Sequence, residues 1–432
     1  MKKGLGIVVF IVLGHVLFAC KTQRVPETTT LAGIDTVPLS LKSRAELHLE
    51  IANKPEGDNL VWSAASLDSL LALVGFGYTA ENQALLENYL GQTIDKTAEQ
   101  SAFLNTKSEG VQVQSANNVW INNQYKFLAG YEKSLSDNFG GLTPLTMDVG
   151  APVDTANKIN LWISDNTSEL INDVIQEDMI DENLLALLVN ALYFKGAWKE
   201  KFENANTKDA TFKATSKAAE GVTEVQVPMM TKFNVDVENG FSEALRTNNV
   251  TVIRLPYKGE THAMYIAFAN EETTKNSEEF GAQRVIGVDT SKDVMDVYNM
   301  YIVSGEAFNL EFYADTCDEF KMPKFEIETK LEGIQNNFKS GSYNDLFKEG
   351  ALAQMTDDRR AKLSFILQKA KIIVNEEGSE AAAVTVGGIG LESIKVPKFL
   401  YINGPFAYAI RDEANKVTLF EGVVRNPLAD DR

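Results

Sequence analysis

The sequence predicts one large α+β domain. Segments with helical spacing of apolar residues and segments with strand-like patterns are mixed along the chain without strict alternation, which is typical of α+β folds. No internal repeat is evident. Of the 432 residues, 44% are hydrophobic and 23% are charged, which is enough for a substantial core. From about residue 40 to residue 428 the chain reads as one continuous body.

Four segments carry apolar residues at helical spacing. They are 46–54, 61–76, 156–175 and 331–338. Asp165 and Asn166 interrupt the third segment, and we expect a possible break there.

Several further segments predict strands. Residues 184–194 are apolar on all sides, as in a central strand, and 363–374 has the pattern of a buried strand. Other strands are expected at 252–257 and 263–269, which form a hairpin around KGET, at 321–330, and on both sides of the turn DEANK within 406–424. The polar stretch 204–224 predicts a surface insertion or loop.

The N-terminal segment predicts export. Lys2 and Lys3 precede an apolar run over 4–18, which is too short for a membrane span and is typical of a secretory signal. The ending LFAC resembles a bacterial lipoprotein signal, which implies a signal peptide over 1–19 and lipid attachment at Cys20. An ordinary signal peptide with an incidental cysteine is the alternative. Residues 20–39 predict a polar tether, and the protein is expected outside the cytoplasm, anchored to the periplasmic face of a bacterial membrane or to the cell surface.

Composition argues against several function classes. A net charge of -19 argues against nucleic acid as a partner. The three histidines have no metal-ligand spacing, and CxxC, HExxH and P-loop motifs are missing, so we predict no metal and no cofactor. Composition alone leaves open a Ser-His-Asp hydrolase, which would have to use His48 or His262. Cys317 is expected to be an ordinary free thiol.

The stretch NEEGSEAAAVT (375–385) combines small side chains with a position directly after a strong strand. It suits a segment that lies in water and can also enter a sheet. In a strand, Ser379, Ala381, Ala383 and Thr385 share one face, where a charge would be buried without a partner. Glu380 falls on the opposite face. A helix beginning at Ser379 is the alternative, although the glycines of VGGIG (386–390) would end it early.

Six motifs, in this order, resemble the serpin family. They are NALYFKGAWKEKF (190–202), PMM (228–230), LPYKGE (255–260), MPKFEIET (322–329), NEEGSEAAAVT (375–385) and GPFAYAI with LFEGVVRNP (404–427). The similarity covers about residues 40–428. It implies a fold of three β-sheets with about nine helices and an exposed reactive centre loop. It also implies a monomer that is not an enzyme and that inhibits serine or cysteine proteases by a suicide mechanism with a covalent acyl complex.

The resemblance also implies functional residues in the hinge and reactive centre loop, over 375–399. The hinge residues are Glu376, Gly378, Ser379, Glu380, Ala381, Ala382, Ala383 and Thr385. Counting seventeen residues from Glu376 predicts cleavage between Glu392 and Ser393. Counting back from Pro405 instead favours Ile394–Lys395, and Leu391 is a further candidate. The small inserting face favours an inhibitor over the rival interpretation, a non-inhibitory serpin that acts as a binding or chaperone-like protein or is cleaved only as a substrate.

Two further regions match the family pattern. Ser63, Ser66 and Asn190 stand where the family's shutter residues do, and Gln368 replaces the usual histidine. Because an amide both donates and accepts hydrogen bonds, Gln368 is expected to preserve the network. Trp198 matches a tryptophan at the breach, at the top of the main sheet, although simple core packing would also explain it.

Overall fold

The structure is a computed structural model. It describes residues 39–53, 58–182, 184–217, 221–277, 281–339, 343–363, 365–379 and 396–429. One compact unit begins at Leu39 and contains all of the described residues. The predicted signal peptide, the tether and Cys20 lie outside the described residues.

Nine α-helices occur within the described ranges, in agreement with the predicted number. They are α1 (Leu39–Ala52), α2 (Ala64–Gly75), α3 (Ala80–Leu90), α4 (Ile94–Ser101), α5 (Ala129–Asn138), α6 (Pro152–Asn166), α7 (Glu243–Asn248), α8 (Val294–Val297) and α9 (Gln335–Lys339). Of the helices that the structure describes, none has the length and apolar character needed to cross a membrane.

Seven of the described strands form the main sheet. Their order is β12 (Phe325–Glu332), β13 (Ile366–Val374), β5 (Ala186–Ala197), β3 (Val111–Asn122) and β2 (Thr106–Ser108), with β14 (Gly378–Ser379) beside β5 and β4 (Leu145–Met147) beside β3. β5 is a central strand, as its largely apolar sequence predicts.

The other ten described strands form a second sheet. Their order is β1 (Leu60–Trp62), β17 (Val417–Val424), β16 (Phe406–Asp412), β9 (His262–Ser277), β10 (Gly281–Val288), β15 (Lys398–Tyr401), β11 (Glu311–Pro323), β7 (Thr223–Phe241) and β6 (Lys208–Ala214), with β8 (Val250–Pro256) beside β7 and β9. Three sheets were expected. In the described strands the second and third are joined, because the long strands β7 and β9 each pair with three neighbours along their length.

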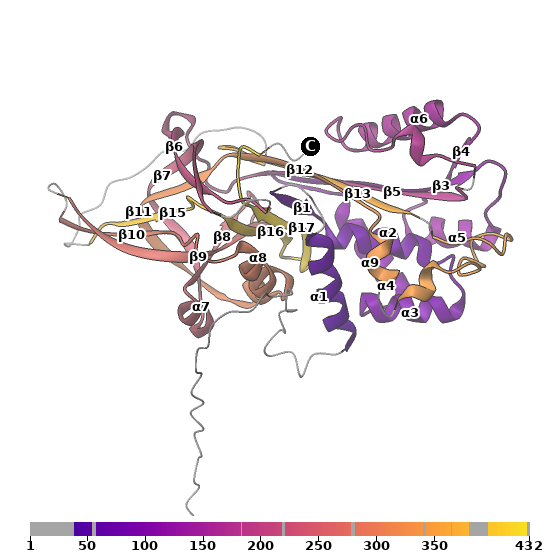
Figure 1. Ribbon diagram of the computed structural model, residues 1–432, viewed down its shortest axis with the longest axis horizontal. Coiled ribbons are helices and arrows are strands. Elements are labelled where there is room, and N and C mark those ends of the chain that lie inside the picture. The colour runs from indigo at the N-terminus through magenta and orange to yellow at the C-terminus, as the bar shows by residue number, and fades with distance from the viewer. Residues whose placement is uncertain are drawn as a thin grey trace, which may run out of the picture. The chain divides into compact units, whose positions relative to one another are not determined.

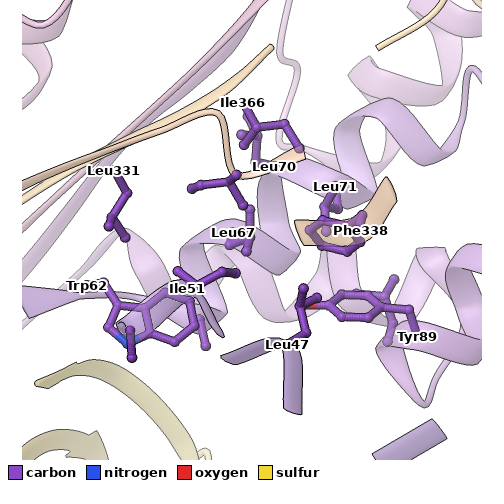
Figure 2. Packing of buried hydrophobic residues seen from close by; sticks show 14 of the residues in the cluster. Leu47, Ile51, Trp62, Leu67, Leu70, Leu71, Tyr89, Leu331, Phe338 and Ile366 are labelled. Carbon is purple, nitrogen blue, oxygen red and sulfur yellow. The ribbon is translucent and has the colours of Figure 1, made fainter. Parts of the chain in front are cut away.

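Helices cover both faces of the main sheet (Figure 1). Side chains of β5 alternate between the faces: Leu187 packs with Ile159 of α6, whereas Leu188 packs with Leu67 of α2. This alternation is the two-residue period of a strand buried on both sides. Figure 2 shows the α2 side, where Leu67 and Leu70 lie close to Ile366 of β13.

The structure corrects five sequence-based expectations. Residues 204–224 are not a loop: they contain β6 and the start of β7, and the buried side chains of Phe212 and Ala214 alternate along β6. The helix expected at 61–76 begins only at Ala64, because the preceding residues pair with β17 as β1.

The other three corrections concern where elements begin and end. The helix expected over 156–175 ends at Asn166, at the polar break noted in its sequence. The strand expected over 321–330 is two strands, β11 and β12, which belong to different sheets and meet at Lys324. The helix expected at 331–338 begins only at Gln335. By contrast, the hairpin of β8 and β9 and the pair of β16 and β17 lie where the sequence predicts them, on either side of the turns KGET and DEANK.

Candidate functional site: the hinge and the seam between β5 and β13

β5 and β13 are direct neighbours over only part of their length. They pair in parallel from Leu188 opposite Ile366 to Leu192 opposite Ala370, where the register ends. Beyond that point β14 takes the place of β13 and pairs antiparallel with β5, with Ser379 opposite Gly196. A strand that continued from β14 along β5 would therefore run between β5 and β13. We call the junction of these two strands the seam.

A tight turn leads the chain from the end of β13 to β14. We call this end of the seam, where the pairing of β5 and β13 stops, its mouth. The backbone amide of Asn375 donates to the Gly378 carbonyl at 2.9 Å, and the Gly378 amide donates back at 3.2 Å. Gly378 has φ +130°, and a Cβ there would lie 2.1 Å from the carbonyl oxygen of Gly196. Both the backbone conformation and the close approach to β5 therefore require glycine at this position.

Trp198 fixes this turn from the side of β5. Its backbone amide donates to the carbonyl of Glu377, and its indole Nε1 donates to the carbonyl of Asn375, both at 3.0 Å. The indole is buried and stacks on Tyr257, with ring centroids 4.7 Å apart and planes within 6°. Trp198 thus packs in the core and also holds the hinge, so the two sequence interpretations both apply.

Glu376 anchors the other side of the turn. Its carboxylate, 5% exposed, accepts a hydrogen bond from Thr207 Oγ1 at 2.7 Å and pairs with Lys324 Nζ at 2.9 Å. Burial raises the pKa of Glu376, but the bonds from Thr207 and Lys324 together outweigh burial, so its pKa lies below the ordinary value. The carboxylate therefore stays charged and holds the end of β13 in place.

Sequence reasoning missed the side chains that bind the carboxylates of Glu376 and Glu377 in the turn. Lys324 lies within the quoted motif MPKFEIET. A lysine between two apolar strand ends was the only sign in the sequence of a charged partner for this residue. Thr207 carried no signal, because it lies in the segment expected to be a loop. Lys201, whose Nζ lies 2.6 Å from Glu377 Oε2, was not singled out either.

The predicted shutter residues meet at the seam. Gln368 of β13 accepts a hydrogen bond from the Ser63 amide at 2.8 Å and donates to the Ser63 carbonyl at 2.9 Å and to Asn190 Oδ1 at 3.0 Å. Asn190 of β5 donates in turn to Ser66 and to Asn117 Oδ1. Asn117 is a further member that sequence reasoning missed. The network joins α2, β3, β5 and β13, and the bond between Gln368 and Asn190 crosses the seam.

The remaining predicted loop residues lie outside the described residues. These are Glu380, Ala381, Ala382, Ala383, Thr385, Leu391, Glu392, Ser393, Ile394 and Lys395. For Ser379 the backbone pairing with Gly196 is described.

The two histidines of the described body do not form a hydrolytic site. His48 packs edge-on against Trp62, and His262 lies 2.9 Å from Thr261 Oγ1 and 3.7 Å from Asp412. Hydrogen bonds within the described part of the chain link neither histidine to a serine. Groups of three or more His, Cys, Asp or Glu residues placed to hold a metal ion do not occur there.

Comparison with known proteins agrees with this architecture. The model of the serpin family, described as serine protease inhibitors, matches residues 45–427. A protein named serine protease inhibitor from Cyanea capillata is 30% identical over 382 residues, which cover 86% of this chain and 93% of that protein. Serine protease inhibitor 42Dd from Drosophila melanogaster is 28% identical, covering 90% of this chain and 97% of that protein.

Solved structures share the fold. An Arabidopsis serpin in a native stressed conformation aligns with a TM-score of 0.72 at 23% identity and covers 90% of this chain and 98% of that chain. Human thyroxine-binding globulin aligns with a TM-score of 0.71 at 20% identity over 90% of this chain and 99% of that one. The matched family model and the coverage of the relatives show that the chain belongs to the serpin family, whose members are mostly protease inhibitors and not enzymes.

Proposed function

We propose that this chain is a suicide inhibitor of serine or cysteine endopeptidases. The protease nucleophile attacks the carbonyl at the scissile bond of the loop, the bond to the next residue breaks, and its nitrogen leaves as a new amino terminus. The protease stays attached as an acyl-enzyme. The freed segment that follows Ser379 then enters the seam before water can release the protease. The observation that carries this proposal is that β14 is already paired with β5 at the point where the pairing of β5 and β13 ends.

The register of β14 supports the proposal. Continued along β5, it puts Ala381, Ala383 and Thr385 opposite Phe194, Leu192 and Asn190. These three β5 residues are at most 3% exposed, so small side chains suit that face. Glu380, on the other face, would lie opposite Lys195, which offers the opposite charge. Thr385 would reach the polar shutter network, where a hydroxyl can hydrogen-bond.

We propose Glu392–Ser393 as the main scissile bond. The same register brings Ile389 opposite Ala186, the first residue of β5. Glu392 lies beyond it, so a protease acylated there is carried past the full length of β5. Cleavage after Val386 would leave a shorter arm. Mass spectrometry of the released C-terminal fragment is expected to show a new amino terminus at Ser393, with neighbouring cuts at Leu391 or Ile394 as minor species. A main fragment whose first residue is Lys395 or a later residue would reject the assignment.

Complex formation tests inhibition directly. Incubation with a panel of serine and cysteine proteases, including a glutamyl-specific one, is expected to give a covalent complex that survives SDS. The matched control is the same protease inactivated at its nucleophile, which cannot be acylated. Cleavage of the chain without a complex by every protease tested would instead support the alternative, a non-inhibitory serpin that acts as a binding or chaperone-like protein or is only a substrate.

We also propose that the protein is lipid-anchored at Cys20 outside the cytoplasm. The supporting observation is the sequence before Cys20, with its basic start and short apolar run. The Cys20→Ala variant is expected to appear in the soluble fraction of a bacterial host, whereas the wild type partitions into membranes. Cys317→Ala is the control, because this cysteine is buried on β11. Equal partitioning of wild type and Cys20→Ala would reject the anchor.

A further inference from the structure

Two buried carboxyl groups share one arginine where α1 meets α2 and β17. Arg44 of α1 pairs with Asp68 of α2 and also donates to the carbonyl of Leu90, the last residue of α3, at 3.0 Å. Glu421 of β17 lies within reach of both charges, and Arg44 is the only cation among the described residues that acts on it. Asp68 is 9% exposed and Glu421 is 4% exposed. Two buried carboxylates with one cation leave one negative charge unbalanced.

The tyrosines around Glu421 supply no charge at neutral pH. The hydroxyl of Tyr298, on the π-helical turn η4 (Tyr298–Val303), accepts a hydrogen bond from Trp62 Nε1 at 2.8 Å and lies next to the Glu421 carboxyl. Burial raises the pKa of Tyr298, and that of Tyr408 on β16, well above the ordinary value. Both hydroxyls therefore stay neutral.

Two further groups line the cluster from α1 and α3. His48 packs edge-on against Trp62, and burial, aided by the charge of Arg44, holds its pKa well below the ordinary value. The ring of Tyr89 lies 5.5 Å from the guanidinium carbon of Arg44, and burial raises the pKa of its hydroxyl. Neither group changes charge near neutral pH.

A proton on Glu421 balances the cluster. Burial raises the pKa of Asp68 as well, but its direct ion pair with Arg44 opposes that rise, so Glu421 is the carboxyl that takes up the proton. Burial, the largest effect, raises the pKa of Glu421 to about 7. When the proton leaves, the carboxylate needs water, because its Oε1 is buried and has no hydrogen-bond partner among the described residues.

α1 is the element that admits this water with the least disruption. β17 is paired on both edges, with β1 and β16, and every residue of α2 except Ala65 is buried. α1 is the first helix of the compact unit, and Figure 2 shows its Leu47 and Ile51 at this interface. Among residues 44–52 of α1, the buried ones are Leu47, His48, Ile51 and Ala52. Lifting α1 therefore exposes the carboxylates without breaking a strand ladder.

We propose that Arg44, Asp68 and Glu421 form a pH-sensitive lock on α1, which holds the helix in place in acidic surroundings and loosens it as the pH rises through neutrality. The direction follows from the raised pKa of the folded state: the stabilising contribution of Glu421 is complete at low pH and is lost as the pH rises to about 7. The lock does not depend on inhibition of a protease.

Hydrogen–deuterium exchange of the full-length protein between pH 6 and 8, corrected for the intrinsic pH dependence of amide exchange, tests the lock. Peptides from α1 report its local opening, those from β5 report global unfolding, and those from α5 report a helix outside the cluster. If opening of α1 returns Glu421 to an ordinary pKa of about 4.3, the opening equilibrium of α1 in the wild type rises about tenfold from pH 6 to pH 8. His48 stays neutral over this range.

Two variants remove the charge and keep the length of the side chain, Glu421→Gln and Glu421→Met. In both, opening of α1 is expected to be independent of pH, and Glu421→Met decides the question if the amide of Glu421→Gln destabilises the fold. Glu326→Gln is the matched control, because it removes a carboxylate that is 58% exposed on β12, and it is expected to follow the wild type.

Three results would overturn the lock. Opening of α1 in the wild type could be constant from pH 6 to 8, or both Glu421 variants could keep the wild-type rise. The third is a rise of α1 and β5 in parallel and to the same extent, which would show that Glu421 acts on the whole fold and has no separate hold on α1. A rise in α1 alone, absent from α5 and from both Glu421 variants, supports the lock.

Discussion

At the scale of residues, Gly378 and Glu376 hold the turn between β13 and β14 in place. Gly378 lets the chain approach β5 at a distance that no side chain permits, and the carboxylate of Glu376, two residues earlier, is held by Thr207 and Lys324. Because the folded pKa of Glu376 is lowered, its stabilising contribution is present above its unfolded pKa. It is lost as the pH falls through the lowered value. The hinge is therefore fully anchored at neutral pH.

The Ser379→Arg variant tests the face of the inserting segment. Ser379 pairs with Gly196 at the mouth of the seam, and the residues on its face would become buried on insertion. An arginine there would be buried without a partner and would slow insertion. We expect at least a tenfold rise in the number of inhibitor molecules consumed per protease, with the cut site unchanged, as measured on gels and by mass spectrometry. Ser379→Thr is the control. Full inhibition by Ser379→Arg would refute the assignment of this face.

The Glu421→Gln variant tests whether burial raises the pKa of this carboxyl, which lies outside the hinge segment. Glu421 lies opposite Trp62 and is 4% exposed, and burial raises its pKa to about 7. Because the folded pKa is above the unfolded one, its stabilising contribution is complete at low pH and is lost as the pH rises to about 7. Between pH 5 and 7 the wild type should lose about 1.4 kcal/mol of unfolding free energy per pH unit relative to Glu421→Gln. Urea titrations at several pH values measure this difference, and equal slopes would contradict it.

At the scale of elements, the proposed mechanism requires the main sheet to open at the seam. β5 and β13 are joined by a short parallel ladder, and Gln368 adds side-chain bonds from β13 to α2 and β5. Separation of the two strands breaks the bond between Gln368 and Asn190. The network therefore sets part of the barrier to opening.

Gln368→Ala is expected to lower the free energy of unfolding by about 1–3 kcal/mol, because buried groups of Ser63 and Asn190 lose their partner. Chemical denaturation measures this loss. Gln226→Ala is the control, since Gln226 also bonds a neighbouring strand through its side chain, to Thr211, but at an exposed site. A loss no larger than that of the control would show that the network does not hold the seam.

The sequence analysis predicted those elements whose residue patterns lie within one short segment of the chain. The largely apolar run of β5 and the turn DEANK between β16 and β17 identify these strands. Gln368 was placed in the shutter by resemblance to a family pattern. Thr207 and the pairing of β10 with β15 escaped prediction, because each depends on contacts between segments far apart in the chain. The break at Lys324 was missed because β11 and β12 follow one another with one residue between them, so that their patterns merge.

At the scale of the whole molecule, the fold holds the loop between two unequal attachments. One, β14, is short and stands at the mouth of the seam; the other, β15, is fixed in a different sheet. We infer that the intact protein is held in a kinetically stable arrangement by the covalent continuity of its loop. A single cut would let the first arm enter the main sheet and gain ladder hydrogen bonds on both edges.

The melting temperature of the protein nicked once in its loop, compared with the intact protein under the same conditions, tests this central claim most directly. The account predicts that the nicked protein melts several degrees higher or more, because the inserted arm completes the main sheet. A nicked protein that melts at or below the temperature of the intact one would show that the cut releases no stabilising insertion, and the inhibitory mechanism would fail with it.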